Sequence, residues 1–413
     1  MFKIPSSVVL QQVRFVDPLA HLDQYADVLI VEGKLESINP GNITTEIERL
    51  DAQGLILAPA LIDLYSTLSQ PGHEERETLS SLLKACQAGG IGELNLFSQI
   101  LDQPAHIALS GQLLRAENSP VKVNFWASPC TDKKLNNLLE LSQAGIIGFL
   151  INNHLENLTL LRRVLEYLKP TGLTLALTPL DRSLSNEGVM REGIQAIRLG
   201  LQGVPCYAET AALSSILQIV EEVGSSVHFM RISTAKSVDL IAQAKRQGLP
   251  VTASTTWLHL LLTSEAINSY NANLRLEPPL GNPVDRSALI GAIRSGIIDA
   301  IAIDHTPYTY EEKTVAFAEA PPGAIGMELA LPALYQELVI TQQLSALELW
   351  QALSVNPLGC IEKSLKRIDS WILFDPNKKW KVDQLSLNSL SHNTHLLGKQ
   401  IQGQVIGSFY GFN

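Results

Sequence analysis

The sequence is poor in charge. Only 17% of its 413 residues are Asp, Glu, Lys or Arg, below the usual figure of roughly a quarter, whereas 46% are hydrophobic. This composition excludes an intrinsically disordered chain and is sufficient for a large buried core. The acidic balance, with 41 Asp and Glu against 31 Lys and Arg, argues against nucleic acid or an anionic membrane surface as a partner.

Cysteine is also scarce, and the four residues share no local motif. They are Cys86, Cys130, Cys206 and Cys360. Without a CxxC pair they indicate neither a zinc knuckle nor a disulfide framework, and unpaired thiols fit a reducing compartment. No apolar run approaches the ~20 residues of a membrane span. Pro5, Arg14 and Asp17 interrupt the first residues, which do not resemble a signal peptide. We therefore expect a soluble, cytoplasmic protein without a membrane partner.

The middle of the chain alternates short apolar runs with helical periodicity. Strands are predicted at 55–64, 94–97, 121–127, 146–151, 173–178, 226–232, 251–255 and 300–304. Helices are predicted at 78–88, 135–144, 155–168, 211–223, 235–247 and 286–295. About eight such units predict an α/β fold with a (β/α)8 barrel. A doubly wound sheet is the competing interpretation, but the Gly-rich turn that it usually carries after the first strand is missing, since that strand leads into Tyr65-Ser66-Thr67.

Both ends of the chain differ from this middle, because they contain only short strands. At the amino end, 26–31 and 35–38 flank a turn at 32–34, which is typical of a hairpin. At the carboxyl end, 371–374 and 405–410 are further strand candidates.

Side chains at the carboxyl ends of the strands mark the expected site, because a barrel carries its chemistry there. They include Tyr65, Thr67, Thr178, Arg231, Asp304 and His305. A metal-dependent hydrolase needs several histidines and carboxylates at such positions, and only Asp304 and His305 qualify. The chain has nine histidines, but His73, His228, His259 and His305 show no HxH or HxxxH spacing. His228 lies three residues before Arg231, so strand alternation predicts that it faces the helices if Arg231 faces the barrel axis.

Several segments, in order along nearly the whole chain, match known sequence motifs. Residues 54–72 (GLILAPALIDLYSTLSQPG) resemble the signature GL-LAPG-IDxHxHLRxPG. Residues 232–238 (ISTAKSV), 248–253 (GLPVTA), 298–307 (IDAIAIDHTP) and 319–323 (EAPPG) resemble HVSTAxSV, GLPVTAE, IDAIATDHAPH and EAPFG. In these motifs the chain resembles dihydroorotases of the amidohydrolase superfamily. The resemblance implies a TIM-type barrel over 54–365 and a composite β-sandwich formed by 1–53 and 366–413.

The chain departs from this family at the positions that would hold its zinc. The two histidines of the HxH pair fall at Tyr65 and Thr67, and the zinc histidines of the fifth and sixth strands fall at Thr178 and Arg231. The bridging carboxylate falls at 151–153, where neither an acid nor a lysine stands.

Substrate-side positions have changed as well. The family's carboxylate-binding arginine falls at Ser69, and its substrate-contacting asparagine falls at Gln99. Glu277 and Gly281 replace a further Asn and Arg of the family. Only the aspartate of the eighth strand, Asp304, is retained.

These departures predict that zinc, the family's cofactor, is absent here. Hydroxyl groups are poor zinc ligands, and the positive charge of Arg231 repels a cation. Without metal no hydroxide forms at neutral pH to attack a cyclic amide. We expect Arg231 to pair with Asp304, because an unpaired buried carboxylate is costly, so Asp304 would be structural rather than catalytic. Trp257, Tyr65 and Tyr308 would place aromatic rings around the mouth.

We therefore predict a non-catalytic dihydroorotase-like protein of pyrimidine biosynthesis. The resemblance implies a structural role as a partner of aspartate transcarbamoylase, and a homodimer. Two alternatives remain open. One is an active zinc-dependent dihydroorotase or related cyclic amidohydrolase with a rebuilt site. The other is a non-catalytic small-molecule-binding protein in which Arg231 receives a carboxylate.

Overall fold

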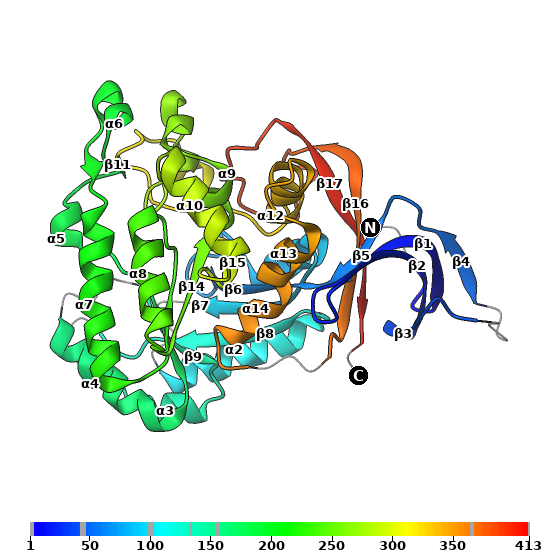
Figure 1. The fold of residues 1–413 in the computed structure, drawn as a ribbon, viewed down its shortest axis with the longest axis horizontal. Coiled ribbons are helices and arrows are strands. Elements are labelled where there is room, and N and C mark those ends of the chain that lie inside the picture. Colours follow the sequence, from blue (N-terminus) through cyan, green and yellow to red (C-terminus); the bar gives the residue numbers. More distant parts are fainter. Residues whose placement is uncertain are drawn as a thin grey trace.

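Two large sheets and one short two-stranded sheet are present in the computed structural model, which describes residues 4–41, 47–97, 103–131, 134–152, 157–363 and 367–411 (Figure 1). The first is an eight-stranded parallel sheet curved into a barrel, with the strand order β15-β14-β13-β10-β9-β8-β7-β6. Its strands are β6 (Leu61–Thr67), β7 (Ile91–Phe97), β8 (Lys122–Ala127), β9 (Gly148–Ile151), β10 (Thr174–Leu177), β13 (Val227–Phe229), β14 (Val251–Thr256) and β15 (Ala300–Ala302). The predicted (β/α)8 fold class is thereby confirmed.

The barrel closes between its first and last strands. The backbone N–H of Thr67 donates to the carbonyl oxygen of His305 at 3.0 Å. The buried Asp63 carboxylate accepts from the Ile303 N–H at 2.8 Å and from the Ser66 hydroxyl. The Asp63 side chain from β6 thus replaces part of the backbone hydrogen bonding between the first and last strands of the barrel.

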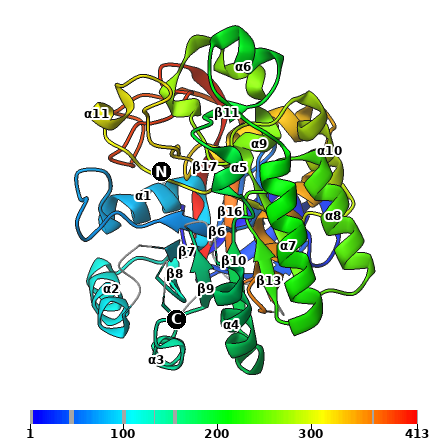
Figure 2. The same cartoon turned by 90° about the vertical axis from the view of Figure 1, so that its left-hand side faces the viewer.

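Helices surround these strands (Figure 2). They are α1 (Leu79–Gly89), α2 (Pro104–Glu117), α3 (Leu138–Gln143), α4 (Leu158–Leu168), α7 (Tyr207–Val223), α8 (Ala235–Arg246) and α10 (Pro283–Arg294). Local sequence explains their ends, since Thr78 caps α1 with a capping box and Gly90 ends it in the left-handed conformation. In α4, the residues at 160, 161, 164, 165 and 168 form one buried apolar face.

Additional short elements lie between and after these strands and helices. Between β10 and α7 lie α5 (Arg182–Ser185), β11 (Met190–Arg191), α6 (Ile194–Leu199) and β12 (Gly203–Val204). Later come α9 (Trp257–Leu261), η2 (Ser264–Ser269), η3 (Ala272–Leu274), α11 (Tyr310–Lys313), α12 (Ala330–Leu334), η4 (Tyr335–Ile340), α13 (Ala346–Trp350), η5 (Gln351–Val355) and α14 (Asn356–Gly359), with η1 (Lys169–Thr171) after α4. Helix α2 and these insertions are absent from the sequence-based prediction.

The second sheet joins both ends of the chain, as predicted. Its seven strands are β1 (Val8–Asp17), β2 (Leu22–Val31), β3 (Lys34–Ile38), β4 (Glu48–Asp51), β5 (Ile56–Pro59), β16 (Ser370–Lys381) and β17 (Gln400–Tyr410). Their order is β17-β16-β5-β1-β2-β3, with β4 pairing with β1. Phe15 and Trp371, whose rings lie 5.2 Å apart, join the two ends in one apolar cluster.

The single strand predicted at 55–64 is wrong, because the chain breaks it at Ala60. Strand β5 pairs with β1 and β16 in the end sheet, whereas β6 begins the barrel. The end sheet therefore reaches Pro59, inside the range 54–365 that the sequence assigned to the barrel. Both strands are buried and apolar, so periodicity gives no sign of the break between them.

The barrel interior is packed with side chains rather than open. Apolar residues from successive strands, among them Leu64, Trp126, Leu150 and Met230, form one buried cluster. The Trp126 indole N–H donates to the Leu64 carbonyl oxygen at 2.8 Å. Chemistry is therefore confined to the mouth. Within the described ranges, no helix is long and apolar enough to cross a bilayer.

Candidate functional site at the barrel mouth

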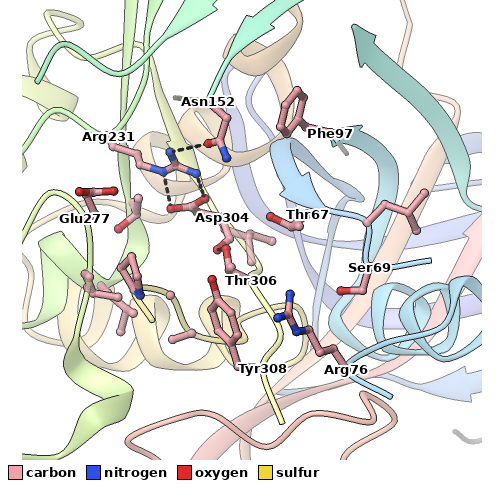
Figure 3. Close-up of a pocket in the computed structure, with 18 of the residues that line it drawn as sticks. Thr67, Ser69, Arg76, Phe97, Asn152, Arg231, Glu277, Asp304, Thr306 and Tyr308 are labelled. Carbon is pink, nitrogen blue, oxygen red and sulfur yellow. Dashed lines mark hydrogen bonds and ion pairs between the residues drawn. The ribbon is translucent and has the colours of Figure 1, made fainter. Parts of the chain in front are cut away.

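A cavity of about 390 Å³ opens at the carboxyl ends of the barrel strands. Its wall includes Thr67, Ser69, Arg76, Arg231, Asp304 and Tyr308 (Figure 3). This volume falls in the range of small-molecule sites, roughly 300–1,000 Å³. The structure thus brings four of the eight site positions predicted from the sequence to one cavity: Thr67, Ser69, Arg231 and Asp304.

Arg231 and Asp304 form a bidentate ion pair in this cavity, which confirms the predicted pairing. Arg231 Nε donates to Asp304 Oδ2 at 2.8 Å, and Nη2 donates to Oδ1 at 2.7 Å (Figure 3). Their side chains are only 15% and 18% exposed. Burial lowers the pKa of Arg231, but the charge of Asp304 and the hydrogen bonds to it outweigh burial and raise that pKa above its ordinary value.

Both members of the pair have a strained backbone. Arg231 has φ of 55° and Asp304 has φ of 53°, in the left-handed region that residues other than glycine seldom occupy. Each lies two residues beyond the end of its strand, since β13 ends at Phe229 and β15 at Ala302, and its side chain enters the mouth. Such strain persists only where surrounding contacts hold it, and it concentrates at functional sites.

The remaining groups around Arg231 hold its guanidinium in one orientation. Nη1 donates to Asn152 Oδ1 at 3.2 Å and to Thr178 Oγ1 at 3.3 Å. The guanidinium carbon lies 5.3 Å from the centroid of the Tyr65 ring. Each of the three guanidinium nitrogens thus already donates at least one hydrogen bond to a side chain of the described part of the chain.

Tyr65 takes part in a buried chain of hydrogen bonds rather than in an open site. Its hydroxyl accepts from the Arg231 backbone N–H at 3.2 Å and lies 3.1 Å from Ser254 Oγ, a hydrogen bond in which either hydroxyl can donate. Ser254 Oγ lies 2.8 Å from His228 Nε2, and His228 Nδ1 lies 2.8 Å from Thr252 Oγ1. Burial raises the pKa of Tyr65 and lowers that of His228 to about 3, so both side chains are neutral.

The predicted orientation of His228 is wrong. His228 contacts Ser254, the partner of Tyr65, and so faces the barrel interior, as does Met230. The alternation rule fails because β13 ends at Phe229 and Arg231 adopts a positive φ. Both His228 and Arg231 can then point inward.

His305 follows Asp304 in sequence but turns away from the cavity. It is fully buried, and its Nδ1 accepts from the Gly326 N–H at 3.2 Å, which leaves the proton on Nε2. Nε2 lies 3.4 Å from Glu77 Oε2. Glu77 also accepts from Ser389 and from the Leu390 N–H, so this pair anchors the connection between β16 and β17.

The other predicted positions fall into three groups. Thr67 and Ser69 line the cavity, as does the exposed His73, whose Nδ1 lies 3.1 Å from Glu75. His259 also lines the cavity but is largely buried, and burial lowers its pKa to about 4. Gln99 lies outside the described residues.

The donor set at the family's zinc positions does not fit zinc. Tyr65 and Thr178 hydroxyls are engaged by Arg231, and the guanidinium itself lies between them and Asp304. Zinc prefers Cys, His and carboxylate ligands. Across the described ranges, no three His, Cys, Asp or Glu side chains come together in a way that could hold a metal ion.

Arg76 is a cavity residue that sequence reasoning missed. Its Nε donates to Glu312 Oε2 at 3.0 Å, and its Nη2 donates to the other carboxylate oxygen. The guanidinium carbon lies 5.0 Å from the centroid of the Tyr308 ring. Arg76 and Glu312 are 236 residues apart, so no local signal could have paired them.

Known relatives resemble the chain over nearly its whole length. A protein of Synechocystis sp. described as a probable dihydroorotase-like protein is 41% identical, covering 96% of this chain and 98% of that protein. A dihydroorotase of Geobacter sp. strain M21 is 33% identical, covering 95% of each. No protein-family profile matches the chain.

Solved structures of low sequence identity share the fold. The L-hydantoinase of Arthrobacter aurescens aligns with a TM-score of 0.86 at 18% identity, over 99% of this chain and 96% of its own. The dihydropyrimidinase of Brevibacillus agri aligns with a TM-score of 0.80 at 20% identity, over 97% and 93%.

Proposed function

The chain belongs to the dihydroorotase family, and from that premise we propose that it is a member without hydrolase activity that serves pyrimidine biosynthesis as a structural protein. One observation carries the proposal. At the carboxyl ends of the barrel strands, the Arg231 guanidinium binds both oxygens of Asp304 at 2.7 and 2.8 Å.

The chemistry of the Arg231–Asp304 pair favours a structural role for it over a role in hydrolysis. Hydrolysis of a cyclic amide needs an activated water and a group that stabilises the developing charge. Asp304 could act as a base, but both of its oxygens accept from Arg231. The pair instead joins the ends of β13 and β15 across the mouth and neutralises two charges in a half-buried place.

Metal content and turnover test the loss of activity directly. Protein purified without chelator should hold well under one zinc per chain by elemental analysis, and should not convert dihydroorotate to carbamoyl aspartate or the reverse. About one or two zinc per chain together with turnover would instead establish the alternative of an active cyclic amidohydrolase, a possibility kept open by the relatives named dihydroorotase.

Aspartate transcarbamoylase is the partner we propose, on the basis of the family resemblance alone. We also propose a cytoplasmic location and a homodimer. Size-exclusion chromatography with light scattering should give a mixed complex when both proteins from the same cell are combined at micromolar concentration. Separate elution of the two proteins would refute the partnership while leaving the lack of turnover to stand on its own measurement.

A further inference from the structure

Helix α6, in the insertion between β10 and α7, carries an exposed apolar face. Ile194 and Ile197 lie three residues apart on one side of the helix and are 70% and 82% exposed. Tyr270, which is 48% exposed, lies beside the end of α6, because its hydroxyl donates to the Leu199 carbonyl oxygen at 2.7 Å. Single exposed apolar side chains are ordinary, whereas neighbouring ones mark an interaction surface. We call Ile194, Ile197 and Tyr270 the α6 face.

The segment that carries α6 is fixed to the rest of the molecule. Ala196, on the opposite side of the helix, is buried, and Gly200 ends the helix with a left-handed φ of 64°. Arg191, which precedes the helix, is also buried, and its Nη2 donates to Ser233 Oγ at 2.6 Å and to the Pro279 carbonyl oxygen at 3.2 Å. The α6 face is therefore formed before any partner arrives, which lowers the entropic cost of binding.

The position of α6 allows a second large molecule to reach it. In Figure 1 the helix lies at the top left, at the opposite end of the molecule from the end sheet, and in Figure 2 it again lies at the upper margin. Its six residues are fewer than the roughly 20–30 residues per side of a standard interface. Helix α6 would therefore form the apolar centre of a contact, and the neighbouring η2 would belong to its polar rim.

The charges beside the α6 face make it complementary to itself. Glu192 precedes the helix and Arg198 follows Ile197; both are exposed, and neither forms an ion pair with another residue of the described ranges. If two α6 helices pack antiparallel about a two-fold axis, Ile194 of each copy meets Ile197 of the other copy. The same axis brings Arg198 of each copy beside Glu192 of the other copy. Opposite charges then meet at both ends of the contact.

We propose that the α6 face is the apolar centre of a two-fold contact between two copies of this chain, with a Glu192–Arg198 pair at each end. The inference rests on the homodimer proposed above and gives that dimer a surface. A second copy suits the face better than a strongly acidic or basic partner does, because the helix carries one charge of each sign at its two ends.

A charge placed in the apolar centre tests this surface. Sedimentation equilibrium of the full chain at micromolar concentration should give about twice the mass of one chain. Ile197→Asp introduces a carboxylate twice into the contact and should raise the dissociation constant at least about 100-fold. Circular dichroism should be unchanged, because Ile197 is mostly exposed in one chain. The matched control is Ile340→Asp at another exposed isoleucine, in η4, and should leave the dissociation constant unchanged.

Exchange of the two charges tests the two-fold geometry. Glu192→Arg or Arg198→Glu alone should weaken the dimer about tenfold, because like charges then meet at both ends of the contact. The double variant should regain the affinity of the unmodified chain, and so should an equimolar mixture of the two single variants, because opposite charges meet again in both cases. Rescue by mixing cannot arise from a change in the fold of one chain.

The outcomes separate this surface from the dimer itself. A dimer that is unchanged in Ile197→Asp, or single charge variants that show no weakening or no rescue on mixing, would overturn the surface and leave the homodimer standing. A chain that stays monomeric at up to about 100 μM would refute both. If such a monomer loses its mixed complex with aspartate transcarbamoylase in Ile197→Asp, the face binds that enzyme instead, and the proposal is again overturned.

Discussion

Removing the charge of Asp304 should destabilise the fold far more than removing one charge from a solvent-exposed ion pair would. In Asp304→Asn the amide can accept only one of the two hydrogen bonds, and the guanidinium of Arg231 stays half-buried without a counter-charge. Asparagine is the suitable replacement because, like aspartate, it tolerates the φ of 53° at this position.

The structure sets the expected magnitude. Removing one member of a fully buried ion pair costs roughly 3–5 kcal/mol. The two side chains here are 15% and 18% exposed, so we expect about 2–3 kcal/mol after screening by water. The double variant Arg231→Met with Asp304→Asn carries no unpaired charge, and its cost should fall below the sum of the single costs by at least about 1 kcal/mol.

Urea unfolding, followed by both tryptophan fluorescence and circular dichroism, measures these free energies and checks that the two sheets unfold together. The control is Arg162 with Glu166, a pair 2.7 Å apart whose side chains are 67% and 47% exposed. A double-mutant cycle on this control pair should give a coupling energy of about 0.5 kcal/mol or less. The argument that the Arg231 guanidinium takes the structural place of a metal ion is refuted by either of two results. One is that Asp304→Asn lowers the free energy of unfolding no more than Glu166→Gln does. The other is that the effects of the Arg231 and Asp304 substitutions simply add.

Three further predictions concern buried groups. Burial raises the pKa of Asp63 from 3.8 to about 7, so the folded chain keeps a proton that the unfolded chain releases, and the free energy of unfolding should fall as pH rises from about 4 to about 7. In urea unfolding at several pH values, Asp63→Asn should flatten this dependence on pH. An unchanged dependence would contradict the raised pKa of Asp63. Tyr65→Phe should cost about 1–2 kcal/mol in the same assay, because it removes one of the two partners of Ser254 and leaves the Arg231 N–H unpaired. A neutral effect would contradict the buried chain of hydrogen bonds. Cys86 and Cys360 are buried with raised thiol pKa values, so a thiol reagent should modify Cys130 and Cys206 first, and uniform reactivity of all four by mass spectrometry would argue against this packing.

The residues that line the site could be predicted from the sequence wherever a strand end or a motif gave their position. Thr67, Arg231 and Asp304 were placed at strand ends by the repeating pattern, and Ser69 was placed by the family resemblance. The structure brings all four to one cavity. The pairing of Arg231 with Asp304 followed from the cost of an isolated buried charge. Both inferences depended on general rules that need no knowledge of the exact backbone path.

Other features of the site depended on backbone detail that the pattern does not carry. His305 was expected in the site by its place beside Asp304, yet it turns to Glu77 because the backbone at Asp304 has a positive φ. The same local geometry at Arg231 reverses the predicted direction of His228. Alternation assumes a regular strand, and the strands end just before these residues.

By itself the sequence determined the order of strand and helix units, because periodicity is a property of neighbouring residues. The joining of the two chain ends and the residues expected at the family's zinc positions followed instead from the resemblance to dihydroorotases. Only the tertiary structure decided where β5 leaves the end sheet and which distant side chains meet. Arg76 reaches Glu312 across 236 residues, and Arg231 reaches Asp304 across 73. Such contacts exist only once barrel closure brings the loops at its mouth together, so no local pattern can encode them.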